Sequence, residues 1–463
     1  MLSAQQHTVS PVDGSVYVER PLARGREIEE CLAEGVRAQV DWCHLSLADR
    51  MTAVAAMVDA FVAMGPEVAQ ELSWQIGRPI THSPHEIAGF ASRARSMLAM
   101  APEALAPVVP SEQPGFRRFV ERSPLGLVLV LAPWNYPYLT AVNTVVPALV
   151  AGNTVLLKHS NQTPLCAERL SQAAEQAGLP PGVFQHVHMN HGAVARVVAD
   201  SRVSHVAFTG SVEGGRAVHG AMAGSFGTIG LELGGKDPAY VRADANAEQA
   251  ANGLVDGAFY NAGQSCCGVE RIYVHEAVYN EFLDAFVAGV ERYRLGSPLD
   301  PETTLGPMVR ADNADRVRAQ VAAAEARGAR GLVNPDLFPE ARKAGAYLAP
   351  QVLVGVDHSM EVMKEETFGP VVGIMKVFDD AEAVKWMNDS RYGLTASIWT
   401  PDLDAAQALG AQVETGTFFA NRCDFLDPEL AWVGVKDSGR GCTLSRVGYE
   451  ALTRPKSFHL KEV

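Results

Sequence analysis

The alternation of short apolar runs with helical stretches constrains the fold of this chain more than any other feature of its sequence. Residues 125–132 (LGLVLVLA) and 154–158 have the length and composition of buried strands. Stretches with helical spacing follow them, at 139–150 and 164–177. Strands that alternate with helices in this way form right-handed βαβ units. The sequence therefore predicts an α/β fold with a doubly wound, mostly parallel sheet.

The rest of the chain continues this pattern after a purely helical beginning. Residues 25–101 are rich in Ala, Glu, Arg and Met at helical spacing and show no strand pattern. Residues 116–121 (FRRFVE) and 456–463 alternate weakly, and we expect an edge strand at the second of these, pairing outside its own domain. Further strands are expected at 183–188, 205–209, 271–274, 351–354 and 371–377, and further helices between 188 and 205, after 211, from 247, and at 278–290 and 311–326.

Composition and charge exclude several classes of protein. The 463 residues are 47% hydrophobic and 20% charged, which is ordinary for a globular chain and excludes disorder. The formal net charge of −14 argues against a nucleic acid or an anionic membrane as partner. No apolar run approaches the roughly 20 residues of a membrane span, and the N-terminus lacks a secretory-signal pattern. Because the 7 cysteines are too sparse for a disulfide framework, we expect a cytoplasmic protein.

The strongest chemical signal is the segment 261–267 (NAGQSCC). A cysteine that follows a tight Gly-Gln turn is presented to a cleft, as a nucleophile requires, and it attacks as the thiolate. The alternative is that Cys266 and Cys267 are small buried apolar residues, as most free cysteines are.

Two further segments hold polar side chains that suit catalysis. Glu232 lies in an apolar, glycine-flanked segment (LELGGK), where burial raises the pKa of a carboxyl group towards that of a general base. A helix cap or a surface ion pair is the alternative for this residue. Asn135 lies between two prolines (PWNYP), directly after a predicted strand, so that its amide can donate to a developing oxyanion. A turn without function is the alternative there.

Two weaker signals concern a phosphate and a metal. The sequence FTGSVEGG at 208–215 lies where a strand leads into a helix, and the free N–H groups of a helix start suit a pyrophosphate. It is not a G-x-G-x-x-G fingerprint, so that this signal alone is weak. His186 and His188 share a face of a strand and His191 follows, but no carboxylate or thiol nearby completes a metal site, and we expect none.

Seven segments occur in the order and at the separations of one known family. They are PWNYP at 133–137, GNTVLLKHS at 152–160, FTGSVEGG at 208–215, LELGGK at 231–236, GQSCC at 263–267, EETFGP at 365–370 and GVKDSGRG at 434–441. On these segments the chain resembles the aldehyde dehydrogenase superfamily along essentially its whole length. The resemblance implies a homodimer or homotetramer built from a doubly wound dinucleotide-binding domain (1–103 and 125–234), an α/β catalytic domain (235–437) and a small β oligomerisation arm with a tail (104–124 and 438–463).

The resemblance also implies a mechanism. Cys266 would be the nucleophile, Glu232 the general base, and Asn135 an oxyanion donor beside the Cys266 backbone N–H. The thiolate would add to an aldehyde, transfer of hydride to a nicotinamide would leave a thioester, and water activated by the base would hydrolyse it to a carboxylic acid. The implied cofactor is NAD, with NADP possible, since Asn161 occupies a position where NAD-preferring members often carry glutamate. The other implied cofactor residues are Trp134, Lys158, Ser160, Thr209, Gly210, Ser211, Gly235, Glu366 and Phe368.

The substrate is the least constrained part of the resemblance. Members that act on succinate semialdehyde often carry arginines at the positions of Asn143 and Tyr260, and neither residue can pair with a carboxylate. We therefore expect an uncharged aromatic or aliphatic aldehyde. A succinate-semialdehyde-type enzyme is the alternative, and Arg422 is the residue that would favour it. The implied tunnel residues are Tyr136, Asn143, Tyr260, Phe425, Leu426 and Trp432.

Three other functions are weighed against this one. A CoA-acylating dehydrogenase usually lacks the base at the position of Glu232. A non-redox cysteine hydrolase or thioesterase does not need a set of dinucleotide-binding residues. A catalytically silent relative is disfavoured because Cys266 and Asn135 are both intact.

Overall fold

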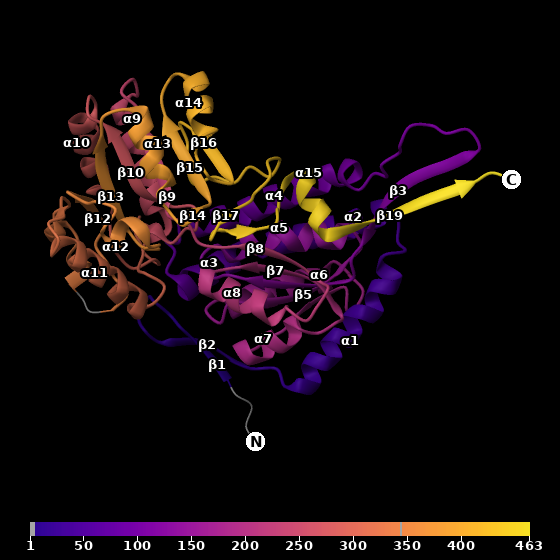
Figure 1. The fold of residues 1–463 in the computed structure, drawn as a ribbon. Coiled ribbons are helices and arrows are strands. Elements are labelled where there is room, and N and C mark those ends of the chain that lie inside the picture. The colour runs from indigo at the N-terminus through magenta and orange to yellow at the C-terminus, as the bar shows by residue number, and fades with distance from the viewer. Residues whose placement is uncertain (1–4, 343–344) are drawn as a thin grey trace.

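The computed structural model describes residues 5–342 and 345–463, which form two helix-covered sheets and a projecting two-stranded ribbon (Figure 1). The first sheet has the order β18-β8-β7-β4-β5-β6, and all neighbours are parallel except β18. The chain winds outwards from β4 in both directions, so a crevice opens at the carboxyl ends of β4 and β7. The strands are β4 (Leu127–Ala132), β5 (Thr154–His159), β6 (Phe184–His186), β7 (Val203–Thr209), β8 (Thr228–Glu232) and β18 (Gly439–Arg440).

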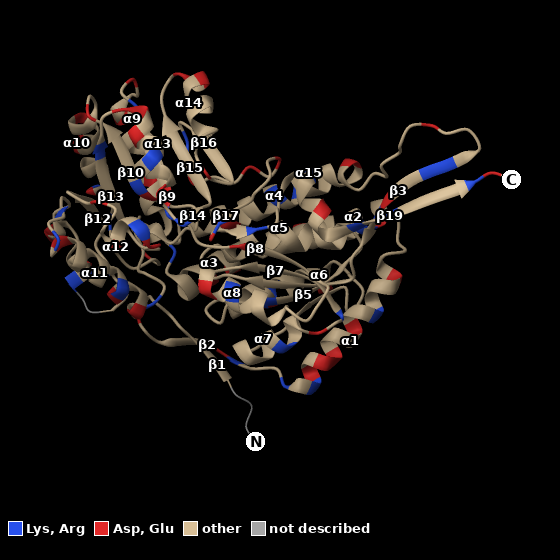
Figure 2. Cartoon of the chain, viewed as in Figure 1, with Lys and Arg blue, Asp and Glu red and all other residues tan. Residues whose placement is uncertain are grey.

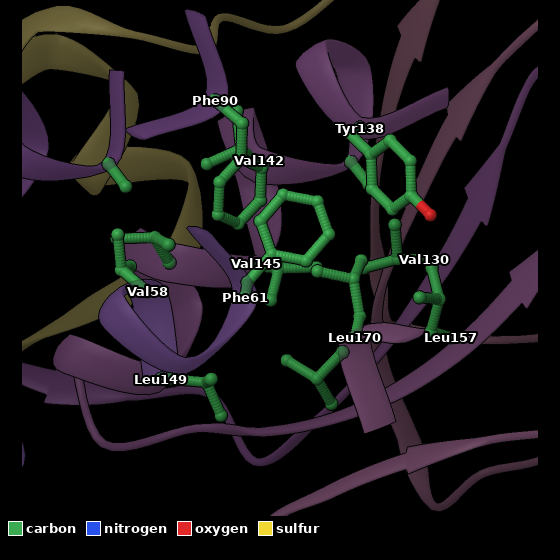
Figure 3. Close-up of a cluster of buried hydrophobic side chains, with 14 of the residues drawn as sticks. Val58, Phe61, Phe90, Val130, Tyr138, Val142, Val145, Leu149, Leu157 and Leu170 are labelled. Atoms are coloured by element: carbon green, nitrogen blue, oxygen red, sulfur yellow. The ribbon is translucent and has the colours of Figure 1, made fainter. Parts of the chain in front are cut away.

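Helices cover both faces of this sheet, because its strands are apolar on both sides. Val130 and Leu157 pack with α2, α4, α5 and α6 on one face (Figure 3). Leu129 and Leu156 pack with α1, α7 and α8 on the other. These helices are α1 (Gly25–Trp42), α2 (Leu47–Ala63), α3 (Gly65–Ile76), α4 (Ser83–Ala104), α5 (Pro137–Val150), α6 (Pro164–Gln176), α7 (His191–Val198) and α8 (Val212–Ala221).

The second sheet has the order β11-β12-β13-β10-β9-β15-β16 and is parallel except for β11. Its apolar faces pack against α9, α10 and α11 on one side and α13 and α14 on the other. The strands are β9 (Asp237–Val241), β10 (Val269–His275), β11 (Arg330–Gly331), β12 (Gln351–Val354), β13 (Val371–Val377), β15 (Thr395–Trp399) and β16 (Thr417–Ala420); the helices are α9 (Ala247–Phe259), α10 (Tyr279–Val290), α11 (Ala311–Glu325), α13 (Asp380–Asn388) and α14 (Leu403–Gly410).

A ribbon of two antiparallel strands, β3 (Phe116–Pro124) and β19 (Thr453–Lys461), extends away from both sheets (Figure 1). Phe119 and Phe458 stack across it with ring centroids 4.6 Å apart. The expected C-terminal strand is therefore present, and its partner lies in the same chain. The short elements are β1 (Gln5–Val9) and β2 (Val16–Pro21), which form a hairpin, β14 (Tyr392–Gly393), β17 (Val435–Lys436), α12 (Glu361–Lys364) and α15 (Ser445–Gly448).

Helix α1, at the outside of the fold, carries both acidic and basic residues (Figure 2). Within the described residues, no single helix is long and apolar enough to cross a membrane; only α2 and α3 taken together, with a bend of 67° between them, reach that length and composition.

The α/β fold and every strand and helix expected from the sequence are confirmed, with boundary shifts of a few residues. The sequence did not predict β1, β2, β8, β9, β15, β16, α13 and α14.

Candidate active site

Cys266 lies in a loop whose backbone turns sharply after α9. Residues 261–263 have φ angles of 53°, 55° and 67°, in the left-handed region that side chains disfavour. A Cβ on Gly263 would lie 2.2 Å from the Gly369 carbonyl oxygen, so the turn requires glycine there. The loop that follows leaves Cys266 partly exposed.

The neighbouring Cys267 is in a different state. It is 2% exposed, and its thiol donates to Asp424 Oδ1 at 2.9 Å. Hydrogen bonding to Cys266 and burial raise the pKa of Cys267 well above its usual value. Cys267 is thus held as a protonated thiol, and Cys266 is left as the accessible one.

Glu232 ends β8 and is held by two hydroxyl groups. Thr443 Oγ1 donates to Glu232 Oε1 at 2.5 Å, and Thr209 Oγ1 donates to Oε2 at 3.2 Å. Burial raises the pKa of Glu232, although both hydroxyls and the Arg93 guanidinium oppose the rise. A cavity of about 340 Å³, also lined by Thr443 and Trp432, reaches Glu232. A carboxyl group with a raised pKa beside a space large enough for water suits a general base.

Asn135 follows β4 and contacts the cysteine loop directly. Its side-chain amide donates to the Gln264 carbonyl oxygen at 3.2 Å, and Asn261 Nδ2 lies 3.3 Å from the carbonyl oxygens of both Asn135 and Gln264. The second hydrogen of the Asn135 amide has no acceptor among the described residues and can donate to a reacting group. Asn135, which follows a strand of the first sheet, therefore contacts the loop before β10 of the second sheet at Asn261 and Gln264, and Gln264 lies two residues before Cys266.

A buried ion pair that the sequence did not reveal holds this junction. Arg78, 2% exposed, donates to the carboxylate of Glu86 and to the Asn135 carbonyl oxygen, and its Nε donates to Asn261 Oδ1 at 3.3 Å. Glu86 Oε1 in turn accepts from the backbone N–H of Tyr138 at 2.8 Å, in the first turn of α5. We call Arg78 and Glu86 the clamp.

Side chains at the carboxyl ends of β5 and β7 fit a dinucleotide. Burial lowers the pKa of Lys158 to about 8, and the Asn161 amide oxygen, 3.2 Å away, is the acceptor it contacts among the described residues. Ser160 accepts from a nearby backbone N–H. Ser211 caps α8, and the first N–H groups of that helix suit a pyrophosphate. A buried ammonium group without a carboxylate partner retains donors for ribose hydroxyl groups.

A second group of residues lies between this crevice and Cys266. Glu366 accepts from the Gly235 N–H at 3.2 Å, and burial and the neighbouring Glu270 raise the pKa of Glu366 to about 8. A Cβ on Gly235 would lie 2.5 Å from the Cys266 carbonyl oxygen, so glycine lets the segment approach. Trp134 and Phe368 pack edge to face at 5.5 Å, and the Gly210 N–H donates to the Glu232 carbonyl oxygen.

Lys236 and Glu270 support the Phe368 loop and were also missed from the sequence. Glu270 accepts from Lys236 Nζ at 2.5 Å and from the backbone N–H groups of Thr367 and Phe368, each at 2.8 Å. Phe368 has a φ angle of 52°, which these bonds hold in place.

The residues expected to line the substrate tunnel differ in their surroundings: some pack in the core, some stack on a neighbouring cation or ring, and one is exposed. Trp432 and Leu426 pack against the core cluster that α4 and α5 build. Tyr136 lies under the Arg78 guanidinium at 4.6 Å, and Tyr260 stacks on His82 at 5.0 Å. Phe425 is 39% exposed.

Two arginines lie near these residues, and the sequence singled out only one of them, Arg422. Arg422 covers the ring of the exposed Phe425 at 3.3 Å. Asn143 is 2% exposed and accepts from Arg93 Nη1 at 3.3 Å. The expectation of an uncharged aldehyde, drawn from positions 143 and 260, did not take Arg93 of α4 into account.

One of the histidines considered as a metal ligand, His188, contacts a carboxylate of the same chain. His188 Nε2 lies 3.1 Å from Glu168, which also pairs with Arg20. No group of three or more potential metal ligands occurs among the described residues.

The chain is similar to known proteins over nearly its whole length. Residues 2–458 match the model of the aldehyde dehydrogenase family. The chain is 34% identical to succinate semialdehyde dehydrogenase [NAD(P)+] Sad of Escherichia coli, covering 95% of both chains. It is 34% identical to a betaine aldehyde dehydrogenase of Cereibacter sphaeroides, covering 98% of this chain and 93% of the relative.

Solved structures agree as well. A structure of 3,6-anhydro-L-galactose dehydrogenase in complex with NAP superposes with a TM-score of 0.93 at 30% identity, covering 99% of this chain and 96% of the other. A structure of PnpE in complex with nicotinamide adenine dinucleotide gives 0.94 at 31% identity, covering 99% and 94%. With a family model matched over nearly the whole length, the chain belongs to the aldehyde dehydrogenase family.

Proposed function

We propose that this protein oxidises an aldehyde to the carboxylic acid with NAD+ or NADP+. The observation that supports the proposal is that Asn135 donates to the Gln264 carbonyl oxygen, in the loop that carries Cys266, while the Arg93 guanidinium lies within electrostatic reach of both Cys266 and Glu232. The dinucleotide would be held by the residues at the ends of β5 and β7 together with Glu366, Trp134 and Phe368. The names of the E. coli relative and of the cofactor-bound structures support both cofactors.

In the first half of the reaction, the Cys266 thiolate adds to the carbonyl carbon. The Asn135 amide and the Cys266 backbone N–H donate to the oxygen as it gains negative charge. Loss of hydride from the carbon leaves a thioester on the sulfur; the nicotinamide, when bound, supplies the hydride acceptor.

In the second half, Glu232 accepts a proton from water, which attacks the thioester carbon. The carbon–sulfur bond breaks, the acid leaves, and the Cys266 thiolate is restored. The cavity beside Glu232 supports this step because it gives water access to the base. The presence of Glu232 argues against transfer of the acyl group to CoA, because that reaction does not need a base to activate water.

The test is to assay a panel of aldehydes with each cofactor and to measure the absorbance of the reduced nicotinamide over time. Formation of reduced cofactor and of one equivalent of acid supports the proposal. Hydrolysis of a thioester or ester without any reduction of NAD(P)+ on the whole panel would point to a non-redox cysteine hydrolase instead.

The division of labour along the chain belongs to the same proposal. Residues 1–103 and 125–234 would bind the cofactor, and 235–437 would carry the nucleophile. Residues 104–124 and 438–463, which include the β3–β19 ribbon, would mediate assembly into a homodimer or homotetramer. The outer edge of β19, which pairs with no described strand other than β3, supports that role.

Replacing Asn135 with alanine should lower kcat by about 10²–10³-fold, because one oxyanion donor is lost. The dissociation constant for NAD+ should stay within about twofold, since the first-sheet crevice is unaltered. Stopped-flow measurement of hydride transfer and fluorescence titration of the cofactor check both parts. A kcat within about twofold of the native value would remove Asn135 from the mechanism.

Replacing Asn161 with glutamate should raise KM for NADP+ about 10–100-fold and leave KM for NAD+ within about threefold. The introduced carboxylate would remain beside Lys158 and would repel a 2′-phosphate, whereas ribose hydroxyls tolerate it. Asn161→Gln, which keeps the amide, is the matched control. Equal losses with both cofactors would show that residue 161 does not face the ribose.

A further inference from the structure

Arg93 is a cation of the catalytic cleft that the proposed mechanism does not use. It lies one turn after Gly89 on the face of α4 that meets α5, and a Cβ on Gly89 would lie 2.8 Å from Leu139 Cδ2. This close approach lets Arg93 Nη1 reach α5, where it donates to the Leu139 carbonyl oxygen at 2.6 Å and to Asn143 Oδ1 at 3.3 Å. The guanidinium is therefore fixed against the helix that begins directly after Asn135.

The position of this guanidinium relative to the reacting groups follows from two independent observations. Cys266 and Leu426 pack against the same core cluster that α4 and α5 build. Burial raises the pKa of Glu232 and of Asp424, and the charge of Arg93 opposes the rise in both. Arg93 thus lies within electrostatic reach of both carboxyl groups beside the nucleophile.

Arg93 forms no direct ion pair with a described residue. Both of its hydrogen bonds use Nη1 and go to uncharged oxygens, and burial lowers the pKa of Arg93. Nε and Nη2 make no hydrogen bond to any described residue, and neither is fully enclosed. Arg78, the other arginine of this region, is by contrast paired with Glu86. A partly buried cation without a partner is costly, and its free Nε–Nη2 edge matches the two oxygens of a carboxylate.

The two acidic residues near Arg93, Asp424 and Glu232, are not available to bind a cationic substrate. Asp424 Oδ1 already accepts from Ser265 Oγ at 2.8 Å and from the Cys267 thiol. Burial raises its pKa, which favours the uncharged form. Glu232 is bound by two hydroxyl groups and is needed as the base. Of these three side chains, Arg93 is therefore the one available to pair with a charged substrate, and its charge is positive.

We propose that Arg93 binds a carboxylate at the far end of the substrate, so that the preferred substrate is an aldehyde that also carries a carboxylate group. This inference rests on the proposed oxidation, and it replaces the uncharged aldehyde expected from positions 143 and 260. A competing role is that Arg93 only offsets the charges of Glu232 and Asp424.

The test uses two aldehydes of equal chain length, succinate semialdehyde and butanal, and scores the ratio of their kcat/KM values. Native protein should favour the semialdehyde. Arg93→Gln should lower the ratio about 10–100-fold, mainly through KM for the semialdehyde, because a charge-assisted hydrogen bond of a remote group is lost. Arg93→Lys should recover part of the ratio. Arg95→Gln is the matched control, since Arg95 lies on the exposed side of α4 in an ion pair with Asp59, and it should leave the ratio unchanged.

Three results would overturn the inference. The first is a native ratio at or below one. The second is an equal loss with both aldehydes in Arg93→Gln. The third is an unchanged ratio with a shifted pH profile for butanal, which would assign Arg93 to Glu232. In each case oxidation of butanal leaves the proposed function standing, whereas failure of every aldehyde to reduce NAD(P)+ would remove the proposed function itself.

Discussion

The Cys266→Ala variant is expected to lose aldehyde oxidation by about 10⁴-fold or more, because no other group can form the covalent adduct. Cofactor affinity should be nearly unchanged, since the dinucleotide residues lie at the ends of β5 and β7. Stopped-flow absorbance should show no initial burst of reduced cofactor, and fluorescence titration should give a native dissociation constant.

Cys267→Ala is the matched control for this prediction. Cys267 is buried, its thiol donates to Asp424, and its pKa is raised, so that it supplies little thiolate. We expect activity within about tenfold of native and a loss of stability of about 1 kcal/mol for the hydrogen bond. An inactive Cys267→Ala beside an active Cys266→Ala would reverse the assignment.

The Glu232→Gln variant should separate the two halves of the reaction. The initial burst should persist with one equivalent of reduced cofactor per site, while the steady-state rate falls by about 10²–10⁴-fold, the range of general base catalysis. Quench-flow analysis should show the thioester accumulating on Cys266. Loss of the burst itself would mean that Glu232 serves chiefly to activate the thiol.

The pH dependence follows from the raised pKa of Glu232. The base is active only when ionised, so the steady-state rate of the native protein should fall as the pH drops through that pKa. The Thr443 hydroxyl lowers this pKa, so Thr443→Val should move the acid limb to higher pH. Glu232→Gln should lack the limb altogether.

The elements that were predictable are those whose signals are local. β4 is a continuous apolar run, β5 is apolar from Val155 to Leu157, and α8 follows a serine whose side chain accepts from the Gly214 N–H. β9 escaped detection because Asp237 and Pro238 are atypical of a central strand, and Asp237 is tolerated there only because Thr395 donates to it at 2.6 Å. That bond joins residues far apart in the sequence, so no local pattern announces it.

The same distinction applies to the site. Cys266, Glu232 and Asn135 lie in short motifs that carry a recognisable chemistry, although their roles stay predictions until the variants are measured. Arg78 lies in the connection between α3 and α4, and Arg93 lies within α4. Nothing local marks either arginine as buried, and the importance of each depends on the segment that packs beside it. A buried cation is recognised only once its neighbours are placed.

The clamp has a consequence for how this protein can be divided or recombined. Asn135 comes from one sheet and the cysteine loop from the other, and Arg78 contacts both through a single guanidinium. A fragment that contains only one of the two sheets would therefore lack some of the residues that shape the site, because both sheets contribute to it. A chimaera that takes the two sheets from different relatives must keep Arg78, Glu86 and Asn261 from the same parent. Otherwise the hydrogen bonds of the Arg78 guanidinium at this junction are lost.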